Sequence, residues 1–361
     1  MDILNQKTMP SISIKKTETP KLKPDFNNLS FGKYFTDHMF LAHYSSKMGW
    51  HKAEITPRQN LSLDPASSVL HYGQALFEGM KAFRKTDGSI TLFRPEYNWS
   101  RMVDGADRLC LQAPPRELFM EGIKSLVKLD QDWVPDQDGS SLYIRPTLIG
   151  TEGFLGVRPS NEYLFFVILS PVGAYYSGGL APLKIWVETD FLRAAPGGLG
   201  HTKAAANYAG SLKAAQLAKQ NGYSQVLWLD VDKKYVEEVG TMNVFFAFEN
   251  EIVTPILDGT ILGGGVRDSV IQLLRHQGKN VVERKVSVEE ILIKHKEGSL
   301  KEIFGTGTAA IVSPVGELNS KEWELNINQN ETGPIAKKLY NDLTAIQHGR
   351  TEDIFSWLEQ I

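Results

Sequence analysis

Cysteine is almost absent from this chain. Cys110 is the only one among 361 residues, so no disulfide can form within the chain. A protein without disulfides suits a reducing compartment, and we expect a cytoplasmic location. Thiolates are also the usual ligands of structural zinc, so a zinc site of that kind is excluded and no metal site is predicted.

Long apolar runs and an excess of one charge are missing as well. The apolar run at 163–169 is too short to cross a bilayer and reads as a buried strand. The first 30 residues have no apolar core of the kind that a signal peptide needs. The 39 basic and 42 acidic residues leave a formal net charge of −3. We therefore expect neither a membrane nor a nucleic acid as a partner.

The length predicts two domains, because one hydrophobic core seldom supports 361 residues. A stretch rich in glycine and proline at 171–182 indicates a linker between them. The predicted organisation is an extended segment at 1–30, a small α+β domain at 31–172, a linker at 173–182 and a large domain at 183–361.

Local patterns predict several elements. Strands are expected at 31–44 and 225–229, and a helix at 207–221. Pro95 opens another helix, since proline costs nothing in a first helical turn. Ser287 and Glu290 form a capping box at the start of a further helix.

One lysine lies in an unusual setting. Lys203 follows the glycines of 197–200 and precedes three alanines, just before the predicted helix. Small neighbours let a flat ligand come close and exclude water. A desolvated lysine loses its proton more readily, and its neutral amine attacks carbonyl carbons. An exposed surface lysine is the ordinary alternative, and the other motifs decide between the two.

Two glycine-rich stretches have a composition that suits the binding of an anion. Gly263, Gly264 and Gly265 precede a predicted helix, whose free N–H groups and dipole favour a phosphate. Residues 304–310 (FGTGTAA) offer hydroxyl and N–H groups in a turn. Either stretch alone is equally typical of an ordinary turn. The P-loop and the Gly-x-Gly-x-x-Gly pattern are both absent, which argues against the common nucleotide-binding folds.

Three charged residues are further candidates for binding a ligand. One of Glu237 and Glu238 can be buried against a positive ligand atom, although an acidic surface loop has the same composition. Tyr143 and Arg145 lie on one face of a predicted strand, where the arginine pairs with a ligand carboxylate or a structural acid. Pyridoxal 5′-phosphate has the carbonyl, the phosphate and the cationic ring nitrogen that these motifs require. A buried carboxylate keeps that ring protonated as an electron sink.

The chain resembles the branched-chain amino acid aminotransferases, which are class IV pyridoxal-phosphate enzymes. The resemblance extends from about residue 31 to 349. It rests on the ordered segments LHYGQALFEGMKAFR, LFRPEYNWSRM, LYIRPTLIGTEGFLGV, VILSPVGAYYSGG, HTKAAANYAG, EEVGTMN and FGTGTAA. It implies the two-domain α/β (α+β) fold of type IV enzymes, with a smaller N-terminal α+β domain and a larger domain whose pseudo-barrel sheet is flanked by helices.

The resemblance also implies roles at the cofactor. Lys203 forms the Schiff base with pyridoxal 5′-phosphate and then moves a proton during catalysis. Tyr208 hydrogen-bonds the phenolic oxygen, and Glu238 pairs with the pyridine nitrogen. The implied ligands of the phosphate are Arg101, Thr308 and the N–H groups of Gly265 and Val266.

Further residues are implied at the substrate. Thr241 lies near the cofactor and, with the backbone at Ala309 and Ala310, near the substrate carboxylate. The residues that line the pocket are Tyr72, Phe77, Tyr143 and Tyr175. Arg145 meets the distal carboxylate of glutamate. Leu155 and Val157 match a loop that reaches the neighbouring subunit's pocket, so a homodimer is implied.

The implied activity moves the amino group of L-leucine, L-isoleucine or L-valine to 2-oxoglutarate, giving branched-chain 2-oxo acids and L-glutamate. D-amino acid aminotransferases and aminodeoxychorismate lyases share the fold and are the alternative. A cofactor-binding protein without activity is a third possibility. Ala310 and Ser313 stand where mammalian-like relatives have a Cys-x-x-Cys pair, so no thiol switch is expected there.

Overall fold

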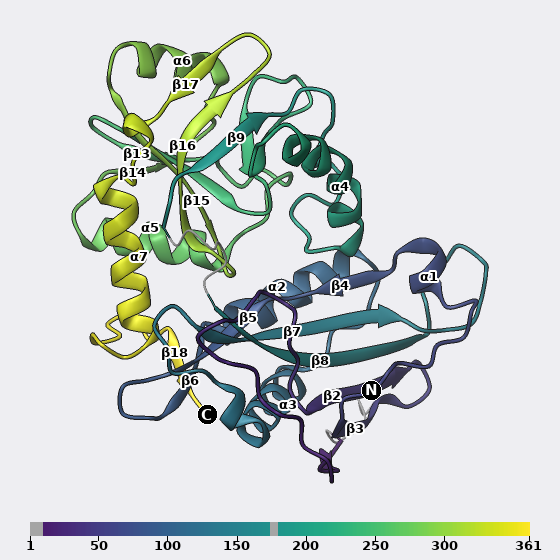
Figure 1. The fold of residues 1–361 in the computed structure, drawn as a ribbon. Helices are drawn as coiled ribbons and strands as arrows, with labels where there is room; N and C mark the ends of the chain where they lie inside the picture. Colours follow the sequence, from purple (N-terminus) through teal and green to yellow (C-terminus); the bar gives the residue numbers. More distant parts are fainter. Residues whose placement is uncertain (1–9, 174–179) are drawn as a thin grey trace, which may run out of the picture. The chain divides into compact units, whose positions relative to one another are not determined.

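The computed structural model describes residues 10–173 and 180–361, which belong to two units (Figure 1). Unit 1 comprises residues 1–174 and 347–361, and unit 2 comprises residues 175–346. The sequence placed all of 183–361 in one domain, whereas the structure groups the C-terminal residues 347–361 with unit 1. Most of the predicted linker at 173–182 falls outside the described residues.

Unit 1 is built on a sheet that has nine strands over its described residues. Their order is β1-β3-β2-β8-β7-β5-β6-β18, with β4 paired to β7. The strands are β1 (Ser13–Ile14), β2 (His38–Ser45), β3 (Gly49–Pro57), β4 (Ala75–Phe77), β5 (Met80–Arg84), β6 (Ile90–Phe93), β7 (Ser141–Gly150), β8 (Glu162–Val172) and β18 (Leu358–Gln360). The helices are α1 (Ser68–Tyr72), α2 (Pro95–Arg108), α3 (Arg116–Leu129) and the short 3₁₀ helix η1 (Gln131–Trp133).

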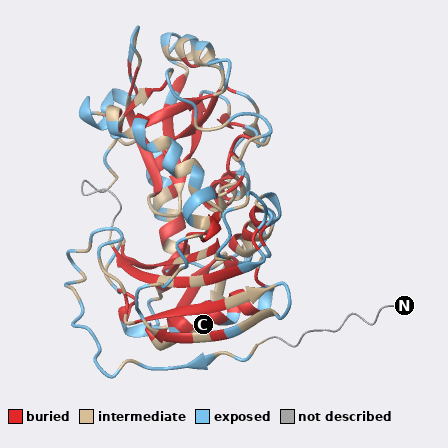
Figure 2. Ribbon diagram, turned by 90° about the vertical axis from the view of Figure 1, so that its right-hand side faces the viewer, coloured by how far each residue is buried: buried red, intermediate tan, exposed pale blue. Residues whose placement is uncertain are grey.

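The core of unit 1 lies between this sheet and α3. Strands β7 and β8 pair along their whole length, from Ser141 opposite Val172 to Gly150 opposite Tyr163. Both are rich in aromatic and branched residues, which favour strands. Phe119 of α3 stacks on Phe165 of β8 with ring centroids 5.7 Å apart. Figure 2 colours most of the sheet as buried.

Two elements of unit 1 differ from the sequence prediction. The strand expected at 31–44 begins only at His38, because residues 31–33 form a turn, with a φ of +69° at Gly32, and residue 37 lies in a bend. The C-terminal strand β18 was not predicted, and it pairs with β6 with Leu358 opposite Phe93. Trp357 is 4% exposed and stacks on Phe355, so the chain end is packed into unit 1. Helix α2 begins at Pro95 as predicted.

Unit 2 has its own sheet, again with nine strands over its described residues. Their order is β11-β10-β9-β16-β15-β12-β13-β14, with β17 paired to β16. The strands are β9 (Leu183–Val187), β10 (Gln225–Leu229), β11 (Val236–Val239), β12 (Asn243–Phe248), β13 (Ile252–Thr254), β14 (Val281–Glu283), β15 (Leu300–Gly307), β16 (Ile311–Asn319) and β17 (Glu324–Asn326). The helices are α4 (Ala205–Gln220), α5 (Gly265–His276), α6 (Val288–Lys296), α7 (Pro334–Gln347) and the 3₁₀ helix η2 (Asn328–Asn330).

The sheet of unit 2 curls. Strand β11 ends the sheet order, yet the tight turn at 240–242 joins it directly to β12, five places along. Strands β12 and β15 are antiparallel neighbours with Phe245 stacked on Phe304. Helix α4 packs on β10 through Ala214, Ala218 and Trp228. The expected curled sheet with flanking helices is therefore confirmed.

Local predictions in unit 2 agree with the structure. Strand β10 has the predicted bounds, and α4 is longer than the predicted helix by two residues at its start. Ser287 accepts a 3.0 Å hydrogen bond from the backbone N–H of Glu290, which is one of the two bonds of a capping box. The carboxylate of Glu290 accepts hydrogen bonds from Arg284 instead of completing the box.

Within the described ranges, no helix is both long and apolar enough to span a membrane. No three histidine, cysteine or acidic side chains gather there as metal ligands.

Candidate active site

Lys203 lies two residues before the start of helix α4. Its Nζ donates a 2.7 Å hydrogen bond to the Oη of Tyr208, one turn into the helix. The loop before the lysine is tied to the same helix, because Asn207 donates 2.8 Å bonds to the carbonyl oxygens of Leu199 and Thr202. The structure therefore brings together two residues that the resemblance places at the cofactor.

Glu238 lies on β11 with only 3% of its surface exposed. Its Oε1 accepts a 2.8 Å bond from the backbone N–H of Leu262. Its Oε2 lies 3.1 Å from the Nε of Arg193, whose side chain is 9% exposed. A buried carboxylate needs such partners, because its charge is costly away from water. The predicted acid is thus buried and anchored on both oxygens.

Arg193 is a site residue that the sequence analysis missed. Besides Glu238, its guanidinium donates a 2.8 Å bond to the carbonyl of Thr260 and a 3.0 Å bond to that of Gly200. Gly200 is three residues before Lys203, so one side chain connects the acid to the loop that carries the lysine. Nothing in the local sequence singles out this arginine, since its partners are distant along the chain.

A narrow pocket joins these groups in unit 2. Its lining residues are Arg193, Asn207, Tyr208, Ser211, Glu238, Gly240 and Thr241. The partner of Lys203 and the buried acid therefore border one space, together with the predicted Thr241. Lys203 does not line this pocket itself, and its amine is connected to the pocket through the hydroxyl group of Tyr208.

The glycine-rich turn leads into α5 as predicted. Gly265 and Val266 are the first residues of α5, and the N-terminal turn of a helix attracts anions through its backbone N–H groups and its dipole. Gly264 allows close packing there, because a Cβ would lie 2.1 Å from the Oδ1 of Asn243. Leu262, which binds Glu238, is three residues before this helix. The end of α5 that is predicted to bind the phosphate is therefore connected to Glu238 through Leu262.

The second small-residue stretch forms the turn between β15 and β16. It contains Thr308, Ala309 and Ala310. Asn243 pairs with Thr306 in the antiparallel β12–β15 ladder, so residue 241 and this turn lie at the same end of the sheet. The position of a Cβ on Gly307 is 4.0 Å from the carbonyl oxygen of Thr241. Thr241 and the turn thus lie close together, as predicted.

Glu237 adds a second buried acid beside Glu238. Burial raises the pKa of Glu237 to about 7, although the charge of Arg193 opposes this increase. Its Oε2 is buried and makes no hydrogen bond within the described part of the chain. The two neighbouring acids therefore have different surroundings, and Glu238 is the one that Arg193 pairs with directly.

Arg101 belongs to unit 1, and its guanidinium pairs with Glu78. Its Nε and Nη2 each lie 2.7 Å from an oxygen of that carboxylate, which is fully buried. Asn98 donates a further 2.7 Å bond to the same carboxylate. Sequence analysis missed Glu78, and the phosphate-binding role of Arg101 stays a prediction.

Tyr143 and Arg145 of β7 share one face, as the strand pattern predicted. The Nη2 of Arg145 donates a 2.9 Å bond to the Oη of Tyr143. The guanidinium also lies over Phe77, 4.6 Å from the ring centroid. Gly79 leaves room for this arrangement, because a Cβ there would lie 2.2 Å from the Tyr143 Oη. Three of the predicted substrate residues are therefore in contact.

Tyr72 and the loop at 151–160 form a separate contact in unit 1. The Oη of Tyr72 donates a short hydrogen bond to the carbonyl oxygen of Leu155. Leu155 and Val157 are 60% and 85% exposed, which suits residues that meet a partner subunit. Tyr175 lies outside the described residues.

The residues of unit 2 fit pyridoxal 5′-phosphate. The amine of Lys203 meets a carbonyl, and Tyr208 offers a phenol beside it. Glu238 supplies a buried negative charge for a protonated ring nitrogen. The first turn of α5 suits a phosphate, since the N-terminal turn of a helix favours an anion.

Comparison with known proteins gives the same family as the resemblance in the sequence. Residues 75–318 match the family model for class IV aminotransferases. The chain is 53% identical over 355 residues to branched-chain-amino-acid aminotransferase 2 of Bacillus subtilis, covering 98% of each chain. It is 44% identical to the branched-chain-amino-acid aminotransferase of Mycolicibacterium smegmatis, covering 92% of each.

Solved structures agree with the sequence matches. The fold resembles that of the Escherichia coli branched-chain amino acid aminotransferase, with a TM-score of 0.74 and 25% identity, covering 90% of this chain and 99% of that one. The T.th. branched-chain amino acid aminotransferase with pyridoxamine 5′-phosphate has a TM-score of 0.73 and 26% identity, covering 88% and 98%. The chain belongs to the class IV aminotransferase family.

Proposed function

We propose that this protein transfers the amino group of L-leucine, L-isoleucine or L-valine to 2-oxoglutarate, with pyridoxal 5′-phosphate as cofactor. The observation that carries the proposal is the Lys203–Tyr208 hydrogen bond beside the buried Glu238, in a chain of this family. The names of the B. subtilis and M. smegmatis relatives support the substrate class. The solved complex with pyridoxamine 5′-phosphate supports the cofactor.

The bound cofactor supplies a carbonyl that links covalently to Lys203 and a ring that withdraws electrons. Tyr208 accepts a hydrogen bond from the amine of Lys203 and so holds it in one direction. Glu238 lies beside Arg193 and is the proposed partner of the ring nitrogen. Gly265, Val266 and Thr308 are proposed phosphate ligands, with Arg101 from unit 1.

Lys203 is also the group best placed to move a proton. With the cofactor bound, the amine of Lys203 would serve as a base, and its hydrogen bond to Tyr208 would hold it in one direction. Thr241, Ala309 and Ala310 are the proposed neighbours of the substrate carboxylate. Thr241 and that turn meet at one end of the sheet, which supports this grouping.

Residues of unit 1 are proposed to select the substrate. Phe77 and Tyr143 offer apolar ring surface to a branched side chain, together with Tyr72 and Tyr175. One methylene more or less in such a lining changes binding by only about 1–3 kcal/mol, so all three amino acids are expected to react. Arg145 already pairs with a phenol, and its positive charge suits the distal carboxylate of glutamate.

We also propose a homodimer in the cytoplasm. The exposed Leu155 and Val157 support the dimer, since apolar side chains on a loop gain from burial against a partner. The single cysteine of the chain supports a reducing compartment.

The test compares Lys203→Ala with Lys213→Ala in the purified protein. Lys213 is exposed on the same helix, so its loss controls for a change of lysine content in α4. We expect the first variant to lose all turnover of leucine, isoleucine and valine with 2-oxoglutarate, and the second to match the unaltered protein. Normal turnover by Lys203→Ala contradicts the proposal.

The same assay separates the alternatives. Activity confined to D-alanine identifies a D-amino acid aminotransferase, and release of an aromatic product from aminodeoxychorismate identifies the lyase. A cofactor absorbance that never changes on adding leucine identifies a binding protein without activity.

A further inference from the structure

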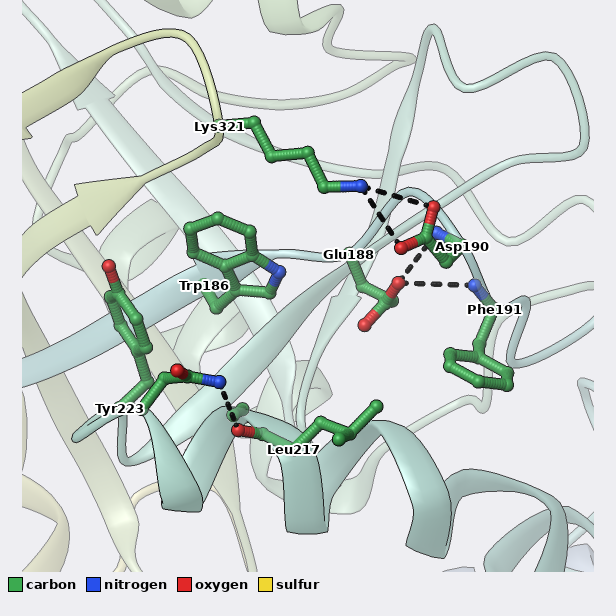
Figure 3. Close-up of a pocket in the computed structure, with 9 residues that line it drawn as sticks. Trp186, Glu188, Asp190, Phe191, Leu217, Tyr223 and Lys321 are labelled. Carbon is green, nitrogen blue, oxygen red and sulfur yellow. Dashed lines mark hydrogen bonds and ion pairs between the residues drawn. The ribbon is translucent and has the colours of Figure 1, made fainter.

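Unit 2 has a second pocket, apart from the residues assigned to the active site (Figure 3). It has a volume of about 460 Å³, within the range typical of small-molecule sites. It lies at the end of β9, beside the C-terminal half of α4 and the turn between β16 and β17. Its lining residues are Trp186, Glu188, Asp190, Phe191, Leu217, Ala218, Asn221, Tyr223 and Lys321.

Glu188 is the buried charge of this pocket. Only 5% of the residue is exposed, and its Oε1 accepts bonds of 2.6 and 3.1 Å from the backbone N–H groups of Asp190 and Phe191. Figure 3 shows the carboxylate between the aromatic rings and the Asp190 side of the pocket. A carboxylate with so little exposed surface, in the wall of a pocket, gains from a positively charged ligand in that pocket.

Aromatic rings line the same space. Trp186 and Tyr223 lie with ring centroids 5.2 Å apart and planes inclined by 51°. Phe191 is a third ring on the wall. The faces of such rings attract ammonium groups, and the attraction strengthens when the cation leaves water.

The remaining charges of the pocket cancel each other. Lys321 lies 3.1 Å from Asp190, and both side chains are about two-thirds exposed, at 63% and 65%. This ion pair therefore lies at the solvent-exposed edge of the pocket. Glu188 is then the one charged residue of the lining without an oppositely charged partner in that lining. The lining carries one net negative charge, three aromatic rings and the apolar side chain of Leu217.

We propose that this pocket binds a small organic cation, with an ammonium group against Glu188 and an apolar body against Trp186, Phe191 and Tyr223. A zwitterion fits less well, because its carboxylate would need a cation in the lining. The ammonium group of Lys321 is the one in the lining, and it already pairs with Asp190. The inference does not depend on the proposed reaction, since no residue of that site lines this pocket.

Choline is the probe, and 3,3-dimethylbutan-1-ol is its neutral analogue of the same shape. Choline has no N–H, so it cannot form an imine with a carbonyl cofactor. We expect calorimetric titration of the full-length protein to detect choline and not the alcohol. Lys203→Ala is expected to bind choline as the unaltered protein does. Equal binding of the two compounds overturns the proposal.

Two variants with opposite effects test the electrostatics. Glu188→Gln keeps an oxygen for the N–H groups of Asp190 and Phe191 but loses the charge, and it should weaken choline binding about tenfold or more. Lys321→Met removes the rim cation from an exposed position and should strengthen binding. Unchanged affinity in Glu188→Gln, or weaker affinity in Lys321→Met, contradicts a cation site. Thermal melts check that both variants are folded.

Discussion

At the scale of single residues, Arg193 is central to the site. It holds one oxygen of Glu238 and two backbone carbonyls, one of them in the loop before Lys203. Its planar guanidinium group donates hydrogen bonds to several partners at fixed angles, whereas the single ammonium group of a lysine cannot reproduce this geometry. We infer that Arg193 fixes the direction of the Glu238 carboxylate and places a positive charge beside it.

Replacing Arg193 tests this inference. Arg193→Met leaves a buried carboxylate without its cation and two carbonyls without donors, so we expect kcat/KM to fall by about tenfold or more. Arg193→Lys keeps the charge and should lose less activity. Steady-state kinetics and the rate at which cofactor leaves the protein measure both effects. A purely structural role predicts a lower melting temperature with unchanged kinetics in the surviving protein.

Glu237 makes stability depend on pH. Its pKa is about 7 in the folded protein and 4.5 without burial, so the folded state binds more protons between these values. The free energy of unfolding therefore falls as the pH rises from about 4.5 to 7. Glu237→Gln should flatten this slope and be more stable than the parent at pH 8. Denaturant titrations at several pH values measure the free energy of unfolding of the parent, of Glu237→Gln and of the exposed control Glu322→Gln. If this free energy depends on pH equally in all three proteins, Glu237 is not the group responsible.

At the scale of elements, a strand caps a helix. Glu302 of β15 is 4% exposed and accepts bonds of 2.8 and 2.9 Å from the N–H groups of Ile335 and Ala336, in the first turn of α7. A carboxylate at a helix N-terminus satisfies free donors and complements the helix dipole. This cap links two elements more than thirty residues apart in the chain.

Removing the cap should destabilise unit 2. Glu302→Ala is expected to lower the free energy of unfolding by about 1–2 kcal/mol, because both N–H groups lose their acceptor. Glu302→Gln keeps one acceptor oxygen and should lose less. The exposed neighbour Lys301→Ala is the matched control. Denaturant unfolding gives the values, and no loss in Glu302→Ala would show that the contact contributes nothing.

Elements defined by neighbouring residues were predictable from the sequence. Strand β10 and the Ser287 cap follow from patterns a few residues long, and so does the shared face of Tyr143 and Arg145. Strand β18 was not predictable, since three residues carry little pattern and their pairing with β6 depends on tertiary packing.

At the scale of the whole molecule, each unit has its own sheet and core. Lys203 and Glu238 lie in unit 2, whereas Tyr143 and Arg145 lie in unit 1. Composition and motifs predicted two domains and the chemistry of each group. The Arg193–Glu238 and Arg101–Glu78 pairs could not be predicted, because each joins residues that are distant along the chain.

The most direct test of the account is the position of the covalent bond to the cofactor. Reduction of the pyridoxal-phosphate-loaded protein with borohydride, followed by proteolysis and mass spectrometry, locates it. The account predicts one phosphopyridoxyl label, on the peptide that contains Lys203. A label on another lysine, or no label in a protein that turns over leucine, would contradict it.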